Sequence, residues 1–221
     1  ECDRAIAAGH LEPVPSHLVD WARSIGHIHP WTVVHQSVEK WRAAQDYSVG
    51  TNRRVISKPF TLTSVRDVRS VVKPGRSVFA KYDLRDGFWL APTHPTSRPH
   101  LMVRHPGTGR LMWCRSLPFG YLNSPLHFCD LTEQVAKLWR KRMSELVGSE
   151  ARFSSMVHLY VFVDDYLLVG DDTEATRVGM REFESLLAEL GMPWARHKHR
   201  GPASAMEFLG FLLVNSPECS R

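Results

Sequence analysis

The sequence predicts an α+β fold in which one antiparallel sheet carries two helices on one face. Strand-forming apolar segments lie at residues 78–82, 157–169 and 207–214, and helix-forming segments lie at 124–147 and 173–190. The resulting order is strand, helix, hairpin, helix, strand, which favours antiparallel pairing with both helices packed on the sheet. With 221 residues, of which 43% are hydrophobic and 23% charged, the chain can form one sizeable core or two closely joined subdomains.

Shorter elements are predicted in the first half of the chain. A short helix is expected near residues 15–21, and an extended segment is expected at 31–36. Segments 100–104 and 110–114 flank a Pro-Gly-Thr-Gly sequence at 106–109, whose proline and glycines predict the turn of a hairpin.

The two longer helices have recognisable ends. The first is predicted to begin at Ser124, because a serine cap followed by Pro125 at the first helical position is a favoured start. It is expected to end near Val147, before Gly148, and the second helix is expected to end at Gly191. The predicted buried residues are Phe128, Leu131, Val135 and Leu138 on the first helix, and Phe183, Leu186, Leu187 and Leu190 on the second.

Two adjacent carboxylates, Asp164 and Asp165, interrupt the apolar run from Val157 to Val169. Adjacent acids repel each other, and burying them without a cation is costly. Strand-forming residues flank them on both sides, so we expect Asp164 and Asp165 to form the tight turn of a hairpin with both carboxylates at its tip. A metal ion would stabilise such a pair, and an ordinary surface turn is the alternative.

Composition narrows the class of protein without naming a function. The chain has 28 Lys and Arg against 23 Asp and Glu, a net charge of +5, which permits a polyanionic partner but does not require one. Its four cysteines, at 2, 114, 129 and 219, form no close pair, so a zinc site is not expected. No secretory or membrane-spanning run is present, and an intracellular location is expected. We interpret the chain, which starts at Glu1 and stops at Arg221, as a piece of a longer polyprotein.

A third carboxylate, Asp83, follows the strand predicted at 78–82. If it lay beside the Asp164–Asp165 hairpin in one sheet, the three acids could hold two Mg²⁺ ions about 3.5 to 4 Å apart for phosphoryl transfer.

Four ordered motifs then carry a resemblance to a known family. They are Asp83-Leu84-Arg85-Asp86-Gly87-Phe88, the segment Leu117 to Pro125, Phe162-Val163-Asp164-Asp165, and Phe208-Leu209-Gly210. In order and spacing they are similar to the palm motifs of reverse transcriptases. The resemblance is to the retrotransposon type, because Pro-Phe-Gly stands where retroviral enzymes have a glutamine before the glycine.

The resemblance implies a right-hand polymerase fold with palm and fingers and without a thumb. Residues 1–82 would be mainly fingers, and residues 83–221 mainly palm, with part of the junction between them at 90–118. An RNase H domain would also be absent. The isolated fragment is therefore expected to bind primer-template weakly and to be distributive or inactive.

The implied activity is template-directed DNA synthesis, in which a deoxynucleotide is added to a primer 3′-hydroxyl. The implied cofactor is a pair of Mg²⁺ ions, with Mn²⁺ as an alternative. The implied partners are an RNA or DNA template with its primer, deoxynucleoside triphosphates and further domains of the same polyprotein, with no membrane.

Carried over by position, the resemblance assigns the catalytic residues. Asp83 and Asp164 would bind the metal ions, with Asp165 as a supporting acid and the backbone carbonyl of Leu84 as a further ligand. Lys198, ten residues before Phe208, would protonate the departing pyrophosphate. The basic run from 196 to 200 could equally be a phosphate grip or a solvated face.

The resemblance also assigns residues that bind nucleotide and primer. Arg42 would bind the triphosphate, although His35 stands where the family has a lysine. Phe88 would be the steric gate that excludes a 2′-hydroxyl. The remaining assignments are Asp86, Gly87, Phe119 and Gly120 to the nucleotide pocket, and Phe208, Leu209 and Gly210 to the primer grip. The alternatives are a solvated arginine at 42, a core aromatic at 88 and a simple loop turn at Gly120.

Two rival functions remain open. The first is a degenerate or domesticated palm that binds nucleic acid without polymerising; the acids and Phe88 argue against it, and His35 favours it. The second is an RNA-dependent RNA polymerase, which Phe88 argues against because a small or polar residue is expected at that position. Cations on the long helix, at 137 and 140–142, could track the template backbone or form a solvated face.

Overall fold

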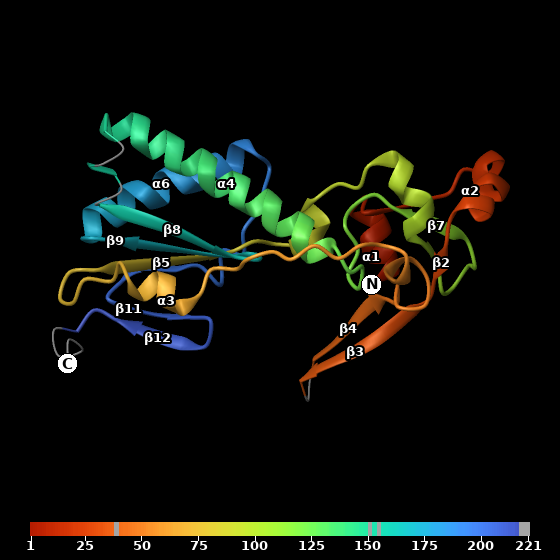
Figure 1. The fold of residues 1–221 in the computed structure, drawn as a ribbon, viewed down its shortest axis with the longest axis horizontal. Helices are drawn as coiled ribbons and strands as arrows, with labels where there is room; N and C mark the ends of the chain where they lie inside the picture. Colours follow the sequence, from red (N-terminus) through yellow and green to blue (C-terminus); the bar gives the residue numbers. More distant parts are fainter. Residues whose placement is uncertain (38–39, 150–151, 154–155, 217–221) are drawn as a thin grey trace. The chain divides into compact units, whose positions relative to one another are not determined.

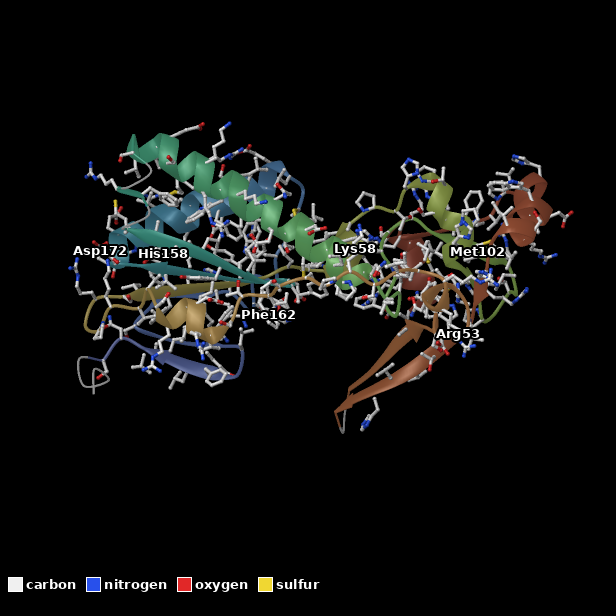
Figure 2. All side chains as sticks on the ribbon, viewed as in Figure 1. Arg53, Lys58, Met102, His158, Phe162 and Asp172 are labelled. Carbon is white, nitrogen blue, oxygen red and sulfur yellow. The ribbon has the colours of Figure 1, made fainter. Side chains whose placement is uncertain are left out.

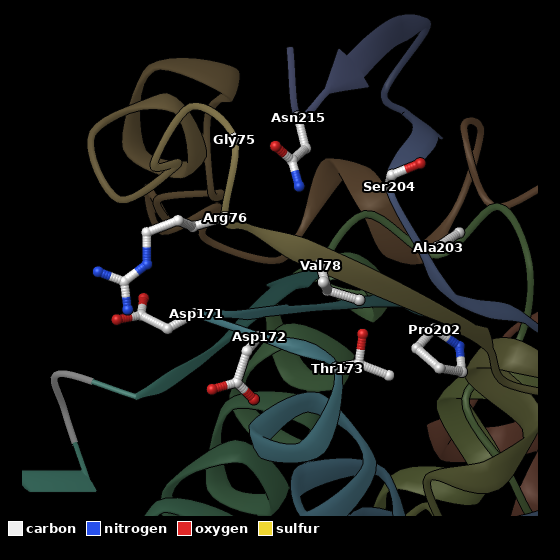
Figure 3. Close-up of a pocket in the computed structure, with 10 residues that line it drawn as sticks. All are labelled: Gly75, Arg76, Val78, Asp171, Asp172, Thr173, Pro202, Ala203, Ser204 and Asn215. Atoms are coloured by element: carbon white, nitrogen blue, oxygen red, sulfur yellow. The ribbon is translucent and has the colours of Figure 1, made fainter. Parts of the chain in front are cut away.

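The computed structural model describes residues 1–37, 40–149, 152–153 and 156–216, without the side chains of residues 36–37 and 40–42 (Figures 1 and 2). The chain forms two compact units, one from residues 1–60 and 88–128 and the other from 61–87 and 129–221. Both combine helices with mainly antiparallel strands, so the predicted α+β class is confirmed.

The first unit is built on a four-stranded sheet. Its strands, in spatial order, are β1 (Leu11–Pro13), β7 (Leu111–Cys114), β6 (Met102–Arg104) and β2 (Ile28–His29). The predicted hairpin is the antiparallel pair β6–β7, whereas β2 pairs with β6 in parallel. A separate hairpin joins β3 (Trp31–Ser37) to β4 (Lys40–Gln45). The short helices of this unit are α1 (Cys2–Ala7), η1 (Ser16–Leu18), α2 (Val19–Ile25), η2 (Thr51–Arg53) and η4 (Pro95–Leu101), together with all but the first residue of η3 (Gly87–Leu90).

A buried histidine lies in the core of the first unit. The Nε2 atom of His29 is 2.9 Å from the Thr51 hydroxyl and 3.2 Å from the carbonyl oxygen of His100, and its ring centroid lies 4.1 Å from that of Tyr47, with the two rings tilted by 43°. Burial lowers the pKa of His29 because it penalises the charged imidazolium, although hydrogen bonds to backbone groups oppose the shift. The fold therefore contains His29 in its neutral form.

The second unit contains a four-stranded antiparallel sheet. Its strands, in spatial order, are β10 (Arg200–Ala203), β5 (Val78–Asp83), β9 (Asp165–Gly170) and β8 (Val157–Phe162). Figure 1 shows α4 (Ser124–Val147) and α6 (Thr173–Glu189) on one face of this sheet, as predicted. The other face is covered by α3 (Val65–Arg69) and by the hairpin of β11 (Ala205–Phe208) and β12 (Phe211–Val214).

Strand alternation divides the side chains of this sheet between two cores. Tyr82 and Tyr166 point to the helix face, where their rings lie 5.1 and 4.8 Å from Phe183 of α6. Phe79 and Leu167 point to the opposite face and pack with residues of α3, β11 and β12. Because residues directly opposite in an antiparallel pair share a face, Asp83 and Asp165 lie on the face that carries Phe79.

The structure corrects several local predictions. The tight turn is formed by Val163 and Asp164, and Asp165 is already the first residue of β9. Segment 207–214 is two strands rather than one, because the chain reverses at Leu209 and Gly210.

The predicted buried faces of both long helices were also partly wrong. Leu138 and Leu190 are exposed. On α4 the buried face continues instead through Thr132, Ala136, Trp139 and Met143, because the apolar stripe advances by four residues more often than by three.

Along the sequence, the chain passes from one compact unit to the other after residues 60, 87 and 128. Residues 61–82 belong to the second unit, because β5 is a central strand of its sheet and Val68 of α3 packs in its core. The first five residues of α4 belong to the first unit, and the rest of that helix belongs to the second. Across the described part of the chain, no helix has the length and apolar character needed to cross a membrane.

Neutral His29 should make stability depend on pH. Its pKa is lower in the folded than in the unfolded protein, so the unfolded chain binds more protons as the pH falls through 6.5. The free energy of unfolding therefore keeps its full contribution from His29 above that pH and loses it below. It falls by at most about 1.4 kcal/mol per pH unit. Urea unfolding between pH 5 and 8 should show a smaller slope for His29→Gln than for the parent. The exposed histidine of His17→Gln provides the control, and equal slopes for parent and His29→Gln would contradict the assignment.

Candidate active site

The three predicted acids come together at one end of the sheet in the second unit. Asp83, the last residue of β5, lies directly opposite Asp165, the first residue of β9. Asp164 occupies the turn between β8 and β9, and its carbonyl oxygen accepts a hydrogen bond of 3.0 Å from the backbone N–H of Leu84. Strand pairing and one backbone hydrogen bond thus bring together residues that are about eighty positions apart in the sequence.

The turn that carries Asp164 has an unusual backbone. Val163 has a φ of 58°, a left-handed conformation that is rare for a residue branched at Cβ. Such conformations cost of order 1–3 kcal/mol and cluster at functional sites, where the surrounding structure enforces them. The backbone of Val163 hydrogen-bonds to the Cys129 thiol, whose pKa burial raises to about 11. This hydrogen bond therefore connects the turn to α4, which carries Cys129.

Asp83 is paired with a lysine. The ammonium of Lys198 donates to both carboxylate oxygens, at 2.9 and 3.1 Å. The segment that carries Lys198 is fixed against the strand end, since the N–H of Ala195 donates to the carbonyl of Asp83 at 2.8 Å. The Lys198 side chain remains 56% exposed, so it can move away from the carboxylate.

Asp165 is paired with a second lysine that the sequence analysis did not single out. Lys81 Nζ lies 3.3 Å from Asp165 Oδ1, an ion-pair distance, and apart from this lysine no described residue hydrogen-bonds this buried oxygen. Burial raises the pKa of Asp165, Lys81 opposes the shift, and the negative charges of Asp164 and Asp83 add to it. Strand alternation could have revealed this lysine, because Lys81 lies two residues before Asp83 on the same strand and so on the same face of the sheet.

The oxygen donors at this strand end suit a hard divalent cation such as Mg²⁺. Asp83, Asp164 and the carbonyl of Leu84 could hold it, with Asp165 nearby on the same face of the sheet. In the described residues, however, no three His, Cys, Asp or Glu side chains are arranged to hold a metal ion. Lys198 and Lys81 supply the positive charge instead, so a cation would have to displace at least Lys198 from Asp83.

The loop after Asp83 approaches the same carboxylates. Asp86 and Gly87 have φ values of 66° and 48°, so the chain turns sharply after the strand. A Cβ atom added to Gly87 would lie 3.9 Å from Asp164 Oδ2, an ordinary contact distance. The predicted nucleotide-pocket residue Gly87 thus lies close to Asp164 within the second unit, and Asp86 precedes it in the same turn.

The other predicted nucleotide-binding residues belong to the first unit and have structural contacts there. The Phe88 ring is 5.3 Å from that of Phe119 and 5.4 Å from that of Phe128. Gly120 has a φ of 92°, and a Cβ atom there would lie 2.0 Å from the carbonyl oxygen of Gln45, so only glycine fits. These contacts support the structural readings of Phe88 and Gly120 without excluding the functional ones.

Asn52 holds the loop that contains Gly120. Its side chain donates to the carbonyl of Gly120 and accepts from the N–H of Leu122, both at 2.9 Å. Arg42 lies on β4 opposite Val34, and its side chain is outside the described residues. His35, on β3 opposite Trp41, is exposed.

The predicted primer-grip residues form the tip of the β11–β12 hairpin in the second unit. Phe208 is 1% exposed and packs beneath the sheet, whereas Leu209 and Gly210 form a tight turn with φ values of 52° and 76°. On α4, Arg142 makes a two-point ion pair with Glu189, and Arg140 donates to the carbonyl of Leu159. These intramolecular partners favour a solvated helix face over a template track for those two arginines.

Comparisons with known proteins agree with this geometry. The sequence profile of the family "Reverse transcriptase (RNA-dependent DNA polymerase)" matches residues 36–213. The Gag-Pol polyprotein of avian reticuloendotheliosis virus is 28% identical over 217 residues, which cover 94% of this chain and 17% of the relative. That of koala retrovirus is 26% identical over 194 residues, which cover 83% of this chain and 11% of the relative. The chain thus spans less than a fifth of these polyproteins.

Solved structures share the fold. The prototype foamy virus protease-reverse transcriptase superposes with a TM-score of 0.70 at 21% identity, over 96% of this chain and 25% of that one. A second foamy viral protease-reverse transcriptase, in complex with double-stranded DNA, superposes with a TM-score of 0.69 at 21% identity, over 96% of this chain and 32% of that one. Since the family profile covers most of the sequence, including all four motifs, the chain belongs to the reverse transcriptase (RNA-dependent DNA polymerase) family of retroelements.

Proposed function

We propose that this chain carries the polymerase active site of a reverse transcriptase, which adds deoxynucleotides to a primer 3′-hydroxyl with two divalent cations. The observation that carries the proposal is the convergence of Asp83, Asp164 and Asp165 at paired strand ends, beside a strained turn. A non-catalytic structural sheet has no need to place three carboxylates together, because their mutual repulsion is destabilising.

In this proposal Asp83 and Asp164 hold the cations, and Asp165 supports them. When bound, divalent cations would favour the deprotonated primer hydroxyl and neutralise charge on the reacting phosphate. Lys198 would hold a proton at Nζ and give it to the leaving pyrophosphate, after moving from the carboxylate of Asp83. Asp86 and Gly87 would face the triphosphate, with Gly87 beside Asp164, and Arg42 would pair with the triphosphate through its guanidinium.

The remaining assignments concern the sugar, the primer and the partners. Phe88 and the Phe119–Gly120 turn would contact the nucleotide, with Phe88 selecting against a 2′-hydroxyl. The turn at Leu209 and Gly210 would hold the primer end. The proposed partners are a primed RNA or DNA template and other domains of a polyprotein, and the proposed cations are Mg²⁺ or Mn²⁺. The fingers assignment for residues 1–82 and the palm assignment for 83–221 are part of the same proposal.

The first prediction tests whether Asp164 is essential. Replacing it with Asn keeps the size of the side chain and removes its charge, so primer extension by the full-length protein should fall at least about a thousandfold. Steady-state extension of a primed template with Mg²⁺ measures the rate, and circular dichroism confirms the fold. Asp171→Asn, at the opposite end of the same strand pair, is the matched control and should extend primers normally. Extension by Asp164→Asn at the parental rate would refute the catalytic role, and a parent without activity would favour a non-catalytic palm.

The second prediction concerns competition between Lys198 and the cation. The Lys198 ammonium competes with a cation for the Asp83 carboxylate, so the variant Lys198→Met should bind Mn²⁺ more tightly. We expect a gain of about two- to fivefold, which matches the free energy of an exposed ion pair. Electron paramagnetic resonance of free Mn²⁺ measures this binding without nucleic acid or turnover. Lys141→Met, which removes a distant lysine on α4, should leave Mn²⁺ affinity unchanged. Unchanged or weaker binding by Lys198→Met would contradict the competition.

The third prediction tests the sugar gate. If the Phe88 ring excludes a 2′-hydroxyl, Phe88→Val should raise the kcat/KM for ribonucleotides relative to deoxynucleotides by roughly tenfold, or about 1.4 kcal/mol. Single-nucleotide insertion assays with the full-length protein give both values. Phe88→Tyr keeps the ring and should retain discrimination. A folded, active Phe88→Val protein with an unchanged ratio would return Phe88 to a core role beside Phe119 and reopen the RNA polymerase alternative.

A further inference from the structure

Lys81 connects two parts of the second unit that the proposed function treats separately. On one side its ammonium lies 3.3 Å from Asp165, at the acidic strand end. On the other side it lies 5.9 Å from the centroid of the Phe208 ring, at the end of β11. Phe208 immediately precedes the turn at Leu209 and Gly210. The Lys81 ammonium therefore lies near both the acidic strand end and the residue before the turn of the hairpin.

The surroundings of Lys81 strengthen its ion pair with Asp165. Its side chain is only 24% exposed and that of Asp165 only 22%, so water screens their attraction less than at a surface. Asp165 Oδ1 is buried, and among the described residues Lys81 is its one polar side-chain partner. Removing the ammonium would therefore leave a buried carboxylate without a cation, which is costly. An ammonium near an aromatic ring also gains a cation–π attraction when it is partly desolvated.

Sequence position explains why Lys81 can reach both groups. It is two residues before Asp83 on β5 and opposite Leu167 on β9, so it shares the sheet face with Asp83 and Asp165. This is the face covered by Phe208, Met206 and Leu213 of the β11–β12 hairpin. A leucine or valine at position 81 would pack there as well, but it would leave Asp165 without its cation.

We propose that Lys81 is a positioning residue that fixes the β11–β12 hairpin relative to Asp165, and so sets where the primer 3′ end lies against the acids. The inference rests on the proposed function, because it concerns the primer terminus. It assigns Lys81 no contact with substrate. It predicts a defect in primer placement rather than in nucleotide binding or metal binding.

The test compares Lys81→Met and Lys81→Arg with the parent in the full-length protein. Lys81→Met should lower kcat for extension by about tenfold while changing the KM for the nucleotide by less than about twofold. Lys81→Arg keeps the positive charge and should recover most of the rate. The matched control is Lys73→Met, which removes a lysine–aspartate pair at the opposite end of the same two strands and should extend primers normally.

A spectroscopic measurement tests placement without turnover. With 2-aminopurine as the 3′-terminal primer nucleotide, Lys81→Met should shift the fluorescence of the protein–primer–template complex, and Lys81→Arg should restore the parental signal. Phe208→Leu keeps the hairpin apolar while removing the ring, so it should reproduce part of the shift. If Lys81 and Phe208 act together, the fluorescence shift of a variant with both Lys81→Met and Phe208→Leu should be smaller than the sum of the two single-variant shifts.

The outcomes distinguish this inference from the proposed function. If the parent does not extend primers, the proposed function fails whatever Lys81 does. If the parent is active and folded Lys81→Met has parental kcat and fluorescence, only the positioning role is overturned. If Lys81→Met does not fold, additive rather than coupled effects of Lys81→Arg and Phe208→Leu on the fluorescence would overturn it.

Discussion

The repulsion among three carboxylates is the constraint on which the active end of the sheet depends. Strand pairing fixes Asp83 opposite Asp165, and the turn places Asp164 beside them, so the protein cannot separate these charges without breaking the sheet. Positive charge must compensate them. Lys198 and Lys81 provide it from two different segments, and each is held by the backbone of the element that carries it.

The long helices and strands could be predicted because their sequence patterns agree with the way in which they pack. Ser124 and Pro125 define the start of α4, and the apolar run on both sides of Asp164 and Asp165 defines β8 and β9. The exact turn could not be predicted, since propensity disfavours the left-handed conformation that Val163 adopts. It depends on tertiary contacts with α4, which no local pattern reveals.

The candidate site was predictable from motifs but its electrostatic partners were not. The identities of Asp83, Asp164 and Lys198 follow from residue order and from resemblance, whereas the pairing of Lys81 with Asp165 requires the register of β5 against β9. Gly120 illustrates the opposite case. Its motif suggested a nucleotide contact, but the close approach of Gln45 already requires glycine there, so conformation and function cannot be separated by sequence.

The two lysines differ in a way that assigns roles to the acids. Lys198 is 56% exposed and comes from a loop, so its ammonium can leave Asp83 for water or for a phosphate at little cost. Lys81 is 24% exposed between Asp165 and the Phe208 ring, where departure would strand a buried charge. The positive charge that is paired with Asp83 can therefore be exchanged, whereas the positive charge that is paired with Asp165 stays in place. In the proposed function, an arriving cation would therefore take its ligands from Asp83 and Asp164, and Asp165 would support it while also holding Lys81 and the hairpin beneath the sheet.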